Sequence, residues 1–420
     1  MEAVTWLPHS KRGPSKEPSM WSRRRFLETV GTLPLVGGLA GGTPTGAVAA
    51  AAGGRRDYFR ELGVRPFINA AGTYTAMTAS LMPSEVMDAI NYASKHYVML
   101  DELHDRVGAR IATLVRAEAA MVTCGAASAL TLGTAAVLTG MDRQKIGELP
   151  DLARMKSDVI IQKAHRFGYD RAVRNCGVRL VEVETREDLE RAITDKTAMM
   201  LFYNNNNKEG RIQDEEFVQL GRKHSIPTMN DAAADVPPVE NLWKYTAMGF
   251  DLVAFSGGKG IRGPQSAGLL LGTKPLIEAA RQNASPNGGA IGRGMKVNKE
   301  ELVGMLAALE RFVQLDHAAE AREFQRRAES IHQAASSVAG VTAEIFVPEV
   351  ANHVPHVRVT RDAASGARPA AAIVRALQDG EPSIAIRSEG DALVIGVWMM
   401  EKGDDKVVAR RLRQELEKRG

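Results

Sequence analysis

Short apolar runs alternate with helical patterns through the middle of the chain. Each run is short enough for one strand, and several are apolar on both faces. Amphipathic segments fall between some of them, for example at 186–193 and 214–224. This alternation predicts an α/β fold with a mostly parallel sheet that helices cover on both faces. The seven expected strands are residues 119–123, 159–162, 178–183, 198–203, 226–230, 252–256 and 267–271.

The last two expected strands are joined by an unusually short connection. Only about ten residues separate them, whereas a crossover between parallel strands needs about a dozen or more. We therefore expect the seventh strand to run antiparallel to the others.

The flanking segments have other patterns. Residues 65–75 are rich in small side chains and predict an irregular segment, and helices are expected at 84–97, 101–115 and 129–137. After Asn298 the pattern predicts one long helix over 299–338, then strands at 341–346, 356–359, 384–387 and 393–397 and helices at 369–377 and 404–418. The expected organisation is a leader and linker (1–52), a large domain with an N-terminal arm (53–297) and a small α+β domain (298–420).

The first 52 residues have the pattern of an export signal. A Ser-Arg-Arg-Arg-Phe-Leu sequence at 22–27 opens a small and apolar stretch at 30–40, and small residues at 47–50 suit a signal peptidase. The pattern resembles a twin-arginine signal, which implies a periplasmic or secreted mature protein. The apolar stretch is too short for a membrane anchor. A basic arm without a targeting role is the alternative, and either Met1 or Met20 could be the start.

Charge and cysteine content exclude several classes of protein. The whole chain has a net charge of +4, and the part after residue 52 keeps 48 basic and 47 acidic residues, a net charge of +1. A nearly neutral chain offers no electrostatic basis for binding nucleic acid. The two cysteines, Cys124 and Cys176, fall in expected core elements and are interpreted as buried thiols. No spacing typical of metal ligands is present, so no metal is expected.

One lysine stands in an unusual place between the last two expected strands. Lys259 is flanked by Gly258 and Gly260, in a turn that follows the apolar run ending at Ser256. An apolar setting disfavours the charged ammonium, so the pKa of Lys259 should fall and the free amine should become available. A Schiff-base lysine needs this property. A solvated turn lysine is the alternative on this stretch alone.

Two strand ends predict a phosphate site, because ligands in such sheets bind at the carboxyl ends of strands. The first strand ends at Thr123, and Gly125 and Ala126 follow near an expected helix, whose free N–H groups can bind an anion. Ser256, at the end of the sixth strand, can reach the same phosphate. A tight turn without a ligand is the alternative.

Three other strand ends offer groups for a planar, cationic ring. His165 follows the second strand and can stack on such a ring, or be a surface histidine. Asn205 lies among asparagines after the fourth strand and can donate to a phenolic oxygen, or belong to a polar loop. Asp231 ends the fifth strand, where a buried carboxylate needs a cationic partner such as a protonated pyridine nitrogen.

These groups together match pyridoxal 5′-phosphate (PLP), which requires a lysine imine and an aspartate partner. The order of Asp231 and Lys259 on consecutive strands is the strongest part of the pattern. The predicted catalytic residues are Lys259, Asp231 and His165, and the predicted cofactor-binding residues are these three with Thr123, Gly125, Ala126, Ser256 and Asn205.

Several segments resemble a known group of PLP enzymes. They are residues 68–73, 122–127, 231–234, 255–268 and 291–297. They resemble the fold-type I, selenocysteine synthase-like family, which includes L-seryl-tRNA(Sec) selenium transferase-like and D-glucosaminate-6-phosphate ammonia-lyase-like proteins. The resemblance covers about residues 58–420. It implies that Lys259 carries the cofactor as an imine, Asp231 pairs with the ring nitrogen and His165 stacks on the ring.

The resemblance also suggests where a substrate binds. Arg387, on an expected strand of the small domain, is the candidate for the substrate carboxylate, and Thr73 is a further contact. Arg262 and Arg293 are candidates for a second anionic group, including across a dimer interface. Ordinary surface ion pairs are the alternative for all three arginines.

The predicted function is that of a homodimeric or larger PLP-dependent lyase or transferase. We expect α,β-elimination from a small amino acid or amino sugar acid, with release of ammonia. Aminotransferase, racemase and aldolase outcomes begin from the same carbanion and stay open, as does a non-catalytic exported binding protein. Selenium transfer on seryl-tRNA is also open, but the export signal, the nearly neutral charge and the glycine before Lys259 depart from the tRNA enzyme. We expect the twin-arginine translocase as a partner during export. We expect no nucleic-acid partner and no membrane anchor.

Overall fold

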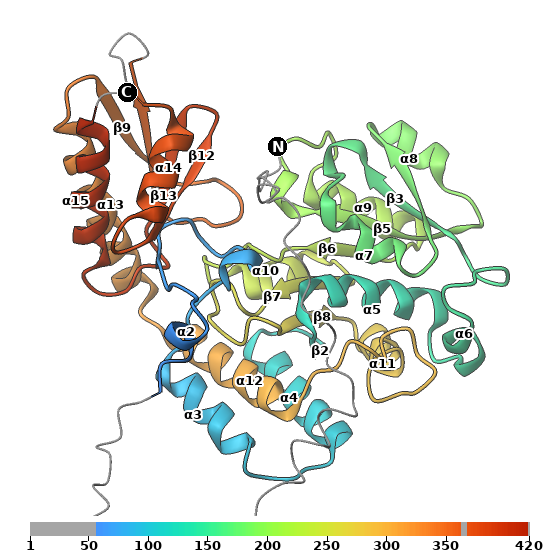
Figure 1. Ribbon diagram of the computed structural model, residues 1–420. Helices are drawn as coiled ribbons and strands as arrows, with labels where there is room; N and C mark the ends of the chain where they lie inside the picture. Colours follow the sequence, from blue (N-terminus) through green and yellow to red (C-terminus); the bar gives the residue numbers. More distant parts are fainter. Residues whose placement is uncertain (1–55, 363–367, 419–420) are drawn as a thin grey trace, which may run out of the picture. The chain divides into compact units, whose positions relative to one another are not determined.

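The computed structural model describes residues 56–362 and 368–418 (Figure 1). Residues up to Glu61 form a unit separate from the rest of the chain. Of that unit the structure describes the short helix α2, Tyr58–Glu61. The export signal expected at 1–52 lies outside the described residues. All elements considered below belong to the unit that begins at Leu62.

A seven-stranded mixed sheet forms the large core of this unit (Figure 1). Its strand order is β2-β8-β7-β6-β5-β3-β4, and the strands from β7 to β4 are mutually parallel. β8 runs antiparallel to both β2 and β7, which confirms the direction predicted for the seventh strand. The strands are β2 (Ala119–Thr123), β3 (Asp158–Gln162), β4 (Arg179–Val183), β5 (Thr197–Tyr203), β6 (Thr228–Asp231), β7 (Leu252–Ser256) and β8 (Gly268–Gly272).

Helices cover both faces of this sheet, as expected for strands that are apolar on both sides. Along β7, Leu252 and Ala254 face one core while Val253 and Phe255 face the other, because side chains alternate along a strand. The first core is covered by α5 (Gly125–Thr139), α7 (Arg171–Arg174) and α11 (Lys274–Gln282), with α6 (Arg143–Glu148) beside α5. The second is covered by α3 (Ser84–Ala93), α4 (Leu100–Leu114), α8 (Arg186–Ala192), α9 (Asp214–His224), α10 (Asn241–Met248) and α12 (Lys299–Gln314).

The single helix predicted over 299–338 is wrong, because the structure has two helices there. α12 ends at Gln314, and α13 (His317–Ser336) begins after a two-residue break. The Asp316 side chain accepts a hydrogen bond of 2.8 Å from the Ala319 N–H. This is N-cap geometry, which starts a new helix.

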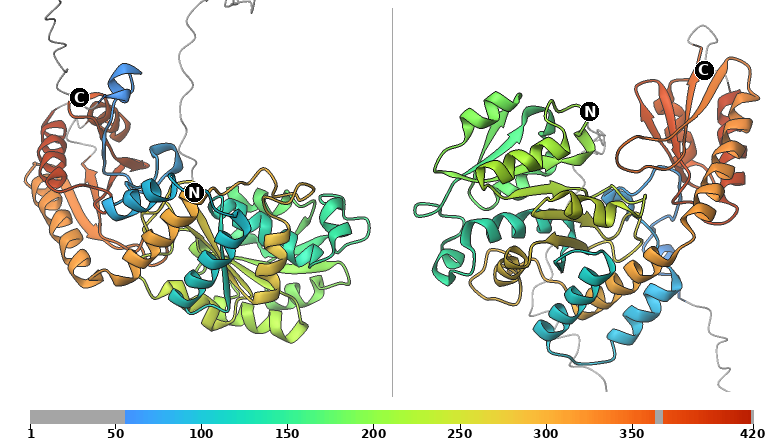
Figure 2. Two further views of the ribbon diagram at one scale, coloured as in Figure 1. Left: turned by 90° about the horizontal axis from the view of Figure 1, so that it is seen from below. Right: turned by 180° about the vertical axis from the view of Figure 1, so that it is seen from behind.

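A second, four-stranded antiparallel sheet lies near the C-terminus, with strand order β12-β13-β10-β9. Helices α13 and α14 pack on one of its faces and α15 packs on these two helices, and all three contribute to a separate apolar core. Figure 2 shows the ribbon of this region from two further sides. His356, Arg358 and Arg387 occupy register positions on the opposite face. The elements are β9 (Val341–Phe346), β10 (His356–Arg361), β12 (Arg387–Glu389), β13 (Ala392–Gly396), α14 (Ala370–Asp379) and α15 (Asp404–Glu417).

The strand predicted at 384–387 is divided between two sheets. β11 (Ile384–Ala385) pairs in parallel with β1 (Ile68–Asn69), inside the segment expected to be irregular, whereas Arg387 starts β12. The Gly396 N–H also donates to the Ala70 carbonyl at 2.8 Å. These bonds hold the segment after β1 against the C-terminal sheet. Among the described helices, none is long and apolar enough to cross a bilayer.

Candidate active site

Lys259 lies in a turn of glycines that pack too closely to carry side chains. A Cβ on Gly258 would lie 2.5 Å from Gln265 Cα, and one on Gly260 would overlap the Val236 carbonyl oxygen. The Gly257 N–H donates to the Ala267 carbonyl at 2.9 Å, which ties the turn to the start of β8. Burial lowers the pKa of Lys259, against the opposing effect of two carboxylates. The direction agrees with the sequence argument for a reactive amine.

Asp231 is the last residue of β6 and interacts with Lys259 from the neighbouring strand. Its Cα pairs with that of Ala254 on β7, and its Oδ1 accepts from the Ala233 N–H at 3.0 Å. The side chain is 4% exposed. Burial raises the pKa of Asp231 to about 6, while the charge of Lys259 works in the other direction. The structure therefore brings the predicted acid and amine together.

Helix α5 begins directly after β2, at Gly125 rather than at residue 129. Cys124 holds the N-cap position without a side-chain cap, and Gly125 has φ +80°. Thr123 Oγ1 donates to the Gly125 carbonyl at 2.9 Å. The first N–H groups of a 15-residue helix are thus left without a capping side chain, which is the condition for anion binding. Thr123 is buried, while Gly125 and Ala126 are half-buried.

The start of β8 keeps this helix start in place. A Cβ on Gly268 would lie 2.5 Å from the Gly125 carbonyl carbon and 2.7 Å from the Ala126 nitrogen. Ser256 is half-buried, and its N–H donates to the Ala233 carbonyl at 3.3 Å. By alternation from Ala254, the Ser256 side chain faces the α5 side of the sheet. Asp231, Ser256 and the helix N-terminus therefore share one side of the sheet, and the lysine turn lies at the same end.

His165 is fully buried, so the surface histidine considered above is wrong. Its Nδ1 accepts from the Tyr203 N–H at 3.3 Å, and its ring meets Phe202 edge-on with centroids 4.4 Å apart. Burial lowers the pKa of His165 to about 4, so the ring is neutral. Neither ring face is exposed in this placement. Stacking on a cofactor stays a prediction.

Of the asparagines after β5, Asn204 is the one that contacts a buried carboxylate, and the role predicted for Asn205 stays a prediction. Asn205 is half-buried and donates to the neighbouring Asn206 side chain at 2.9 Å. Asn204 is 3% exposed, and its Nδ2 donates to Asp235 and to the Tyr245 hydroxyl. The sequence argument missed Asp235 and Tyr245. A second aspartate four residues after Asp231 was the one signal that could have indicated them.

Arg387 lies beside the segment that follows β1. Its guanidinium carbon is 5.7 Å from the Tyr74 ring centroid, and Nη1 pairs with Glu389 Oε1 at 3.0 Å. Nε is buried and has no hydrogen-bond partner among the described residues. Thr73, 8% exposed, precedes Tyr74. The predicted contacts Arg387 and Thr73 thus lie close together along one edge of the C-terminal sheet.

The other two predicted arginines are placed differently. Arg262 follows the lysine turn with φ +58°, and its Nη2 donates to the Trp398 carbonyl at 2.8 Å. It lines a cavity with Gly260 and Trp398, and burial lowers its pKa. Arg293 is half-buried in the segment after α11. Among the described residues, neither arginine forms a surface ion pair of the kind considered above.

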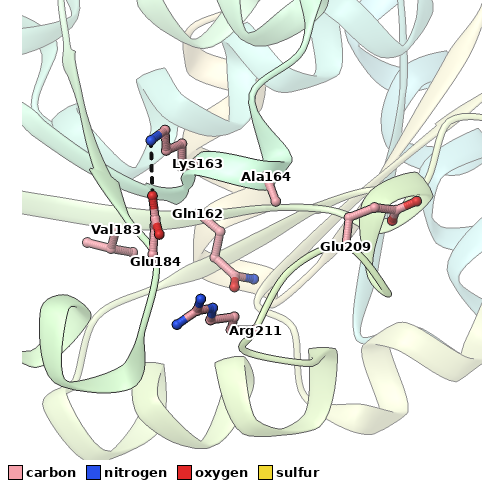
Figure 3. Close-up of a pocket in the computed structure, with 7 residues that line it drawn as sticks. All are labelled: Gln162, Lys163, Ala164, Val183, Glu184, Glu209 and Arg211. Carbon is pink, nitrogen blue, oxygen red and sulfur yellow. Dashed lines mark hydrogen bonds and ion pairs between the residues drawn. The ribbon is translucent and has the colours of Figure 1, made fainter.

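A further cavity lies at the end of β3, and Figure 3 shows its lining. Lys163 turns toward Glu184, with Nζ 3.0 Å from Oε1, and Arg211 lies beside Gln162. The lining contains neither Lys259 nor Asp231, although its Gln162 side chain lies 3.4 Å from the His165 ring. It is formed by Gln162, Lys163, Ala164, Val183, Glu184, Glu209 and Arg211.

Comparison with known proteins identifies the group to which this arrangement belongs. Residues 67–378 match the family described as SelA, L-seryl-tRNA selenium transferase. The chain belongs to this family. The match extends over the seven-stranded sheet and over β9 and β10 of the C-terminal sheet, and it confirms the family resemblance drawn from the sequence segments.

Relatives within and near the SelA family have different activities. D-glucosaminate-6-phosphate ammonia lyase of Salmonella typhimurium is 31% identical, covering 86% of this chain and 98% of that protein. A 5′-C-glycyluridine monooxygenase-decarboxylase of a Streptomyces species is 28% identical, covering 78% of this chain and 84% of that protein. The L-seryl-tRNA(Sec) selenium transferase of Moorella thermoacetica is 24% identical, covering 84% and 82%.

Solved structures agree with the fold class. The structure of D-glucosaminate-6-phosphate ammonia-lyase has a TM-score of 0.75 at 28% identity, covering 86% of this chain and 99% of that one. A serine palmitoyltransferase that contains PLP has a TM-score of 0.54 at 15% identity, covering 83% and 87%. The second likeness shows the fold alone. The α/β fold-type I architecture predicted from the sequence is confirmed.

Proposed function

We propose that this SelA-family protein is a PLP-dependent enzyme that uses Lys259 to catalyse α,β-elimination from an amino acid or amino sugar acid, with release of ammonia. One observation carries the proposal: Asp231, at the end of β6, and Lys259, in the turn after the adjacent parallel strand β7, act on each other's charge beside a helix N-terminus without a side-chain cap. The 31% identity to an ammonia lyase over nearly the whole of that protein favours elimination over the other outcomes.

The residues present fit PLP. The anionic phosphate matches the first N–H groups of α5, where the helix dipole is positive. The absence of a side chain on Gly268 leaves those groups where a Cβ would otherwise displace them. The hydroxyls of Ser256 and Thr123 lie at the ends of two strands that flank this helix start. Asp231 offers a buried carboxylate to a protonated ring nitrogen, and Lys259 an amine to an aldehyde.

When bound, PLP supplies an electron sink for negative charge at the substrate α-carbon. The chain's own residues supply the proton chemistry. Because burial lowers the pKa of Lys259, its Nζ is more readily the free amine than that of an exposed lysine, and it can act as the base that takes the α-proton. Asp231 would keep a proton on the ring nitrogen of the bound cofactor by its negative charge, which burial makes more effective than it would be in water.

Arg387 is proposed to bind the substrate carboxylate. Its buried Nε has no partner among the described residues, and an incoming carboxylate would satisfy it. The Tyr74 ring supports the guanidinium from the segment after β1. Thr73 is proposed as a neighbouring contact.

The test is a spectral and product screen on purified protein loaded with PLP. D- and L-amino acids and amino sugar acids, including D-glucosaminate 6-phosphate, are added while absorbance, ammonia and keto acid are recorded. We expect at least one substrate to release equimolar ammonia and keto acid. Lys259→Ala should abolish release, whereas Lys274→Ala, at an exposed position on α11, should not. Protein that binds no PLP, or that transfers an amino group without releasing ammonia, would contradict the proposal.

We also propose export by the twin-arginine route and assembly as a homodimer acting on a small molecule. The Ser-Arg-Arg-Arg-Phe-Leu sequence at 22–27 supports export, and the charge of +1 after residue 52 argues against RNA as a substrate. Exposed Tyr97, Val98 and Met99 between α3 and α4 support a self-association surface. Cell fractionation of the wild type and of an Arg23→Lys, Arg24→Lys variant tests export. Light scattering tests assembly, with a monomer as the contradicting result.

A further inference from the structure

Asp235 is a second buried carboxylate near Lys259, and the proposed function gives it no role. Its side chain is 2% exposed. Its Oδ2 accepts from Asn204 Nδ2 at 2.5 Å and from the Tyr245 hydroxyl at 3.0 Å, and Asn204 also lies 2.8 Å from that hydroxyl. Three buried polar groups thus form a closed triangle that joins the end of β5, the loop after β6 and the middle of α10. Burying a carboxylate costs free energy even when it is hydrogen-bonded, which favours a function for Asp235.

The chain around Asp235 packs directly against the lysine turn. The Ser256 N–H donates to the Ala233 carbonyl at 3.3 Å, and Gly260 lies so close to the Val236 carbonyl that no side chain would fit. Asp235 and Lys259 are each one residue from this contact. Asp235 also bonds through its N–H to the Ala232 carbonyl at 3.1 Å, which fixes the loop after β6. The carboxylate is therefore held near Lys259 by both main-chain and side-chain bonds.

We propose that Asp235, held by Asn204 and Tyr245, is a positioning residue that supplies Lys259 with a second negative charge in addition to that of Asp231. This inference rests on the proposed function only for the role of Lys259 as the reactive amine. One carboxylate balances one cation. With Asp231 paired to the ring nitrogen of a bound cofactor, Asp235 is the buried carboxylate left to balance a positive nitrogen on Lys259.

The charged surroundings of this pair are simple among the described residues. Burial lowers the pKa of Lys259, and the negative charges of Asp231 and Asp235 act to raise it. The pKa of Asp235 is raised by burial and by the charge of Asp231, and it is lowered by the hydrogen bond from Tyr245 and by the charge of Lys259. Burial and the negative charges of both carboxylates also raise the pKa of Tyr203, at the end of β5. Burial raises the pKa of Asp235 to about 7, so it is a carboxylate above that pH and largely protonated below it. Its effect on Lys259 should therefore appear as the pH rises through about 7.

The experiment measures the reactivity of Lys259 in the full-length, cofactor-free protein. Trace labelling with formaldehyde and cyanoborohydride is followed by peptide mass spectrometry from pH 5.5 to 9, with exposed Lys406 as the internal reference. Asp235→Asn removes the charge and keeps the shape. We expect Lys259 in this variant to label about fivefold faster than in the wild type above pH 7, the equivalent of ~1 kcal/mol. The ratio should approach one near pH 5.5.

Two further variants keep the inference testable. Asp158→Asn removes a buried carboxylate that Arg179 pairs at the other end of the sheet, and it should leave the Lys259 profile unchanged. Tyr245→Phe removes one donor from Asp235 and should move the onset of the wild-type effect to higher pH, which tests the idea even if Asp235→Asn fails to fold. Profiles identical to wild type in every variant that folds would overturn the inference. Failure of PLP to attach at Lys259 would instead overturn the proposed function.

Discussion

The contact between Gly268 and the start of α5 gives the sharpest test of the phosphate site. In Gly268→Ala the new Cβ would meet the Gly125 carbonyl carbon at 2.5 Å and the Ala126 nitrogen at 2.7 Å. Carbon atoms in contact normally lie about 3.5–4.0 Å apart, so backbone must move by roughly 1 Å. Overpacking of this kind costs about 1–3 kcal/mol. Since both struck atoms belong to the helix start, the shift should displace the N–H groups proposed to bind phosphate.

Two measurements separate a loss of stability from a loss of cofactor binding. Urea unfolding of the cofactor-free variant should show a loss of about 1–3 kcal/mol. PLP titration followed by absorbance should show a dissociation constant at least about tenfold higher, equivalent to ~1.4 kcal/mol. The matched control is Gly147→Ala in α6, where a Cβ would meet nothing within 4 Å. It should leave PLP binding unchanged and add up to about 1 kcal/mol of stability. A Gly268→Ala protein with wild-type stability and wild-type PLP affinity would refute the reasoning.

Two other predictions concern the substrate and the buried carboxylates. Arg387→Met should raise KM by roughly tenfold or more while changing kcat little, because a charged hydrogen-bond partner of the substrate is lost. Arg413→Met, which removes an exposed ion pair with Glu417 on α15, is the control, and equal effects of the two would argue against a carboxylate site. Burial raises the pKa of Asp231 to about 6 and that of Asp235 to about 7, from 3.8. The folded cofactor-free protein then binds more protons than the unfolded chain between about pH 4 and 7, so these groups should make its stability fall as the pH rises through that window. Urea midpoints at pH 5 and 7.5 should show a smaller drop in Asp231→Asn than in the wild type, and an equal drop would contradict the assignment.

The large sheet followed from local pattern alone. Each apolar run was short enough to be one strand, and the ten-residue connection around Lys259 left no room for a crossover helix, so the direction of β8 could be deduced before any contact was known. The lowered pKa of Lys259 could also be predicted from local pattern, because glycines and apolar strands on both sides leave little water around an amine.

The features that the sequence predicted wrongly or left undetermined are those where tertiary packing decides between equal local choices. Apolar spacing continues across the break between α12 and α13, and only the capping bond of Asp316 ends one helix and starts the next. Four asparagines in a row carry no signal of which one faces inward. That depends on β5 ending at Tyr203, which places Asn204 against Asp235. His165 is turned into the core by a short 3-10 turn after β3, a direction that strand periodicity does not encode.

The central claim is that Lys259 carries the cofactor, and covalent trapping tests it most directly. Protein incubated with PLP is reduced with borohydride, digested and analysed by peptide mass spectrometry. We expect one pyridoxyl-phosphate group per chain, on the peptide that contains Lys259, and none in Lys259→Ala. Modification concentrated on another lysine, or unchanged total modification in Lys259→Ala, would contradict the account.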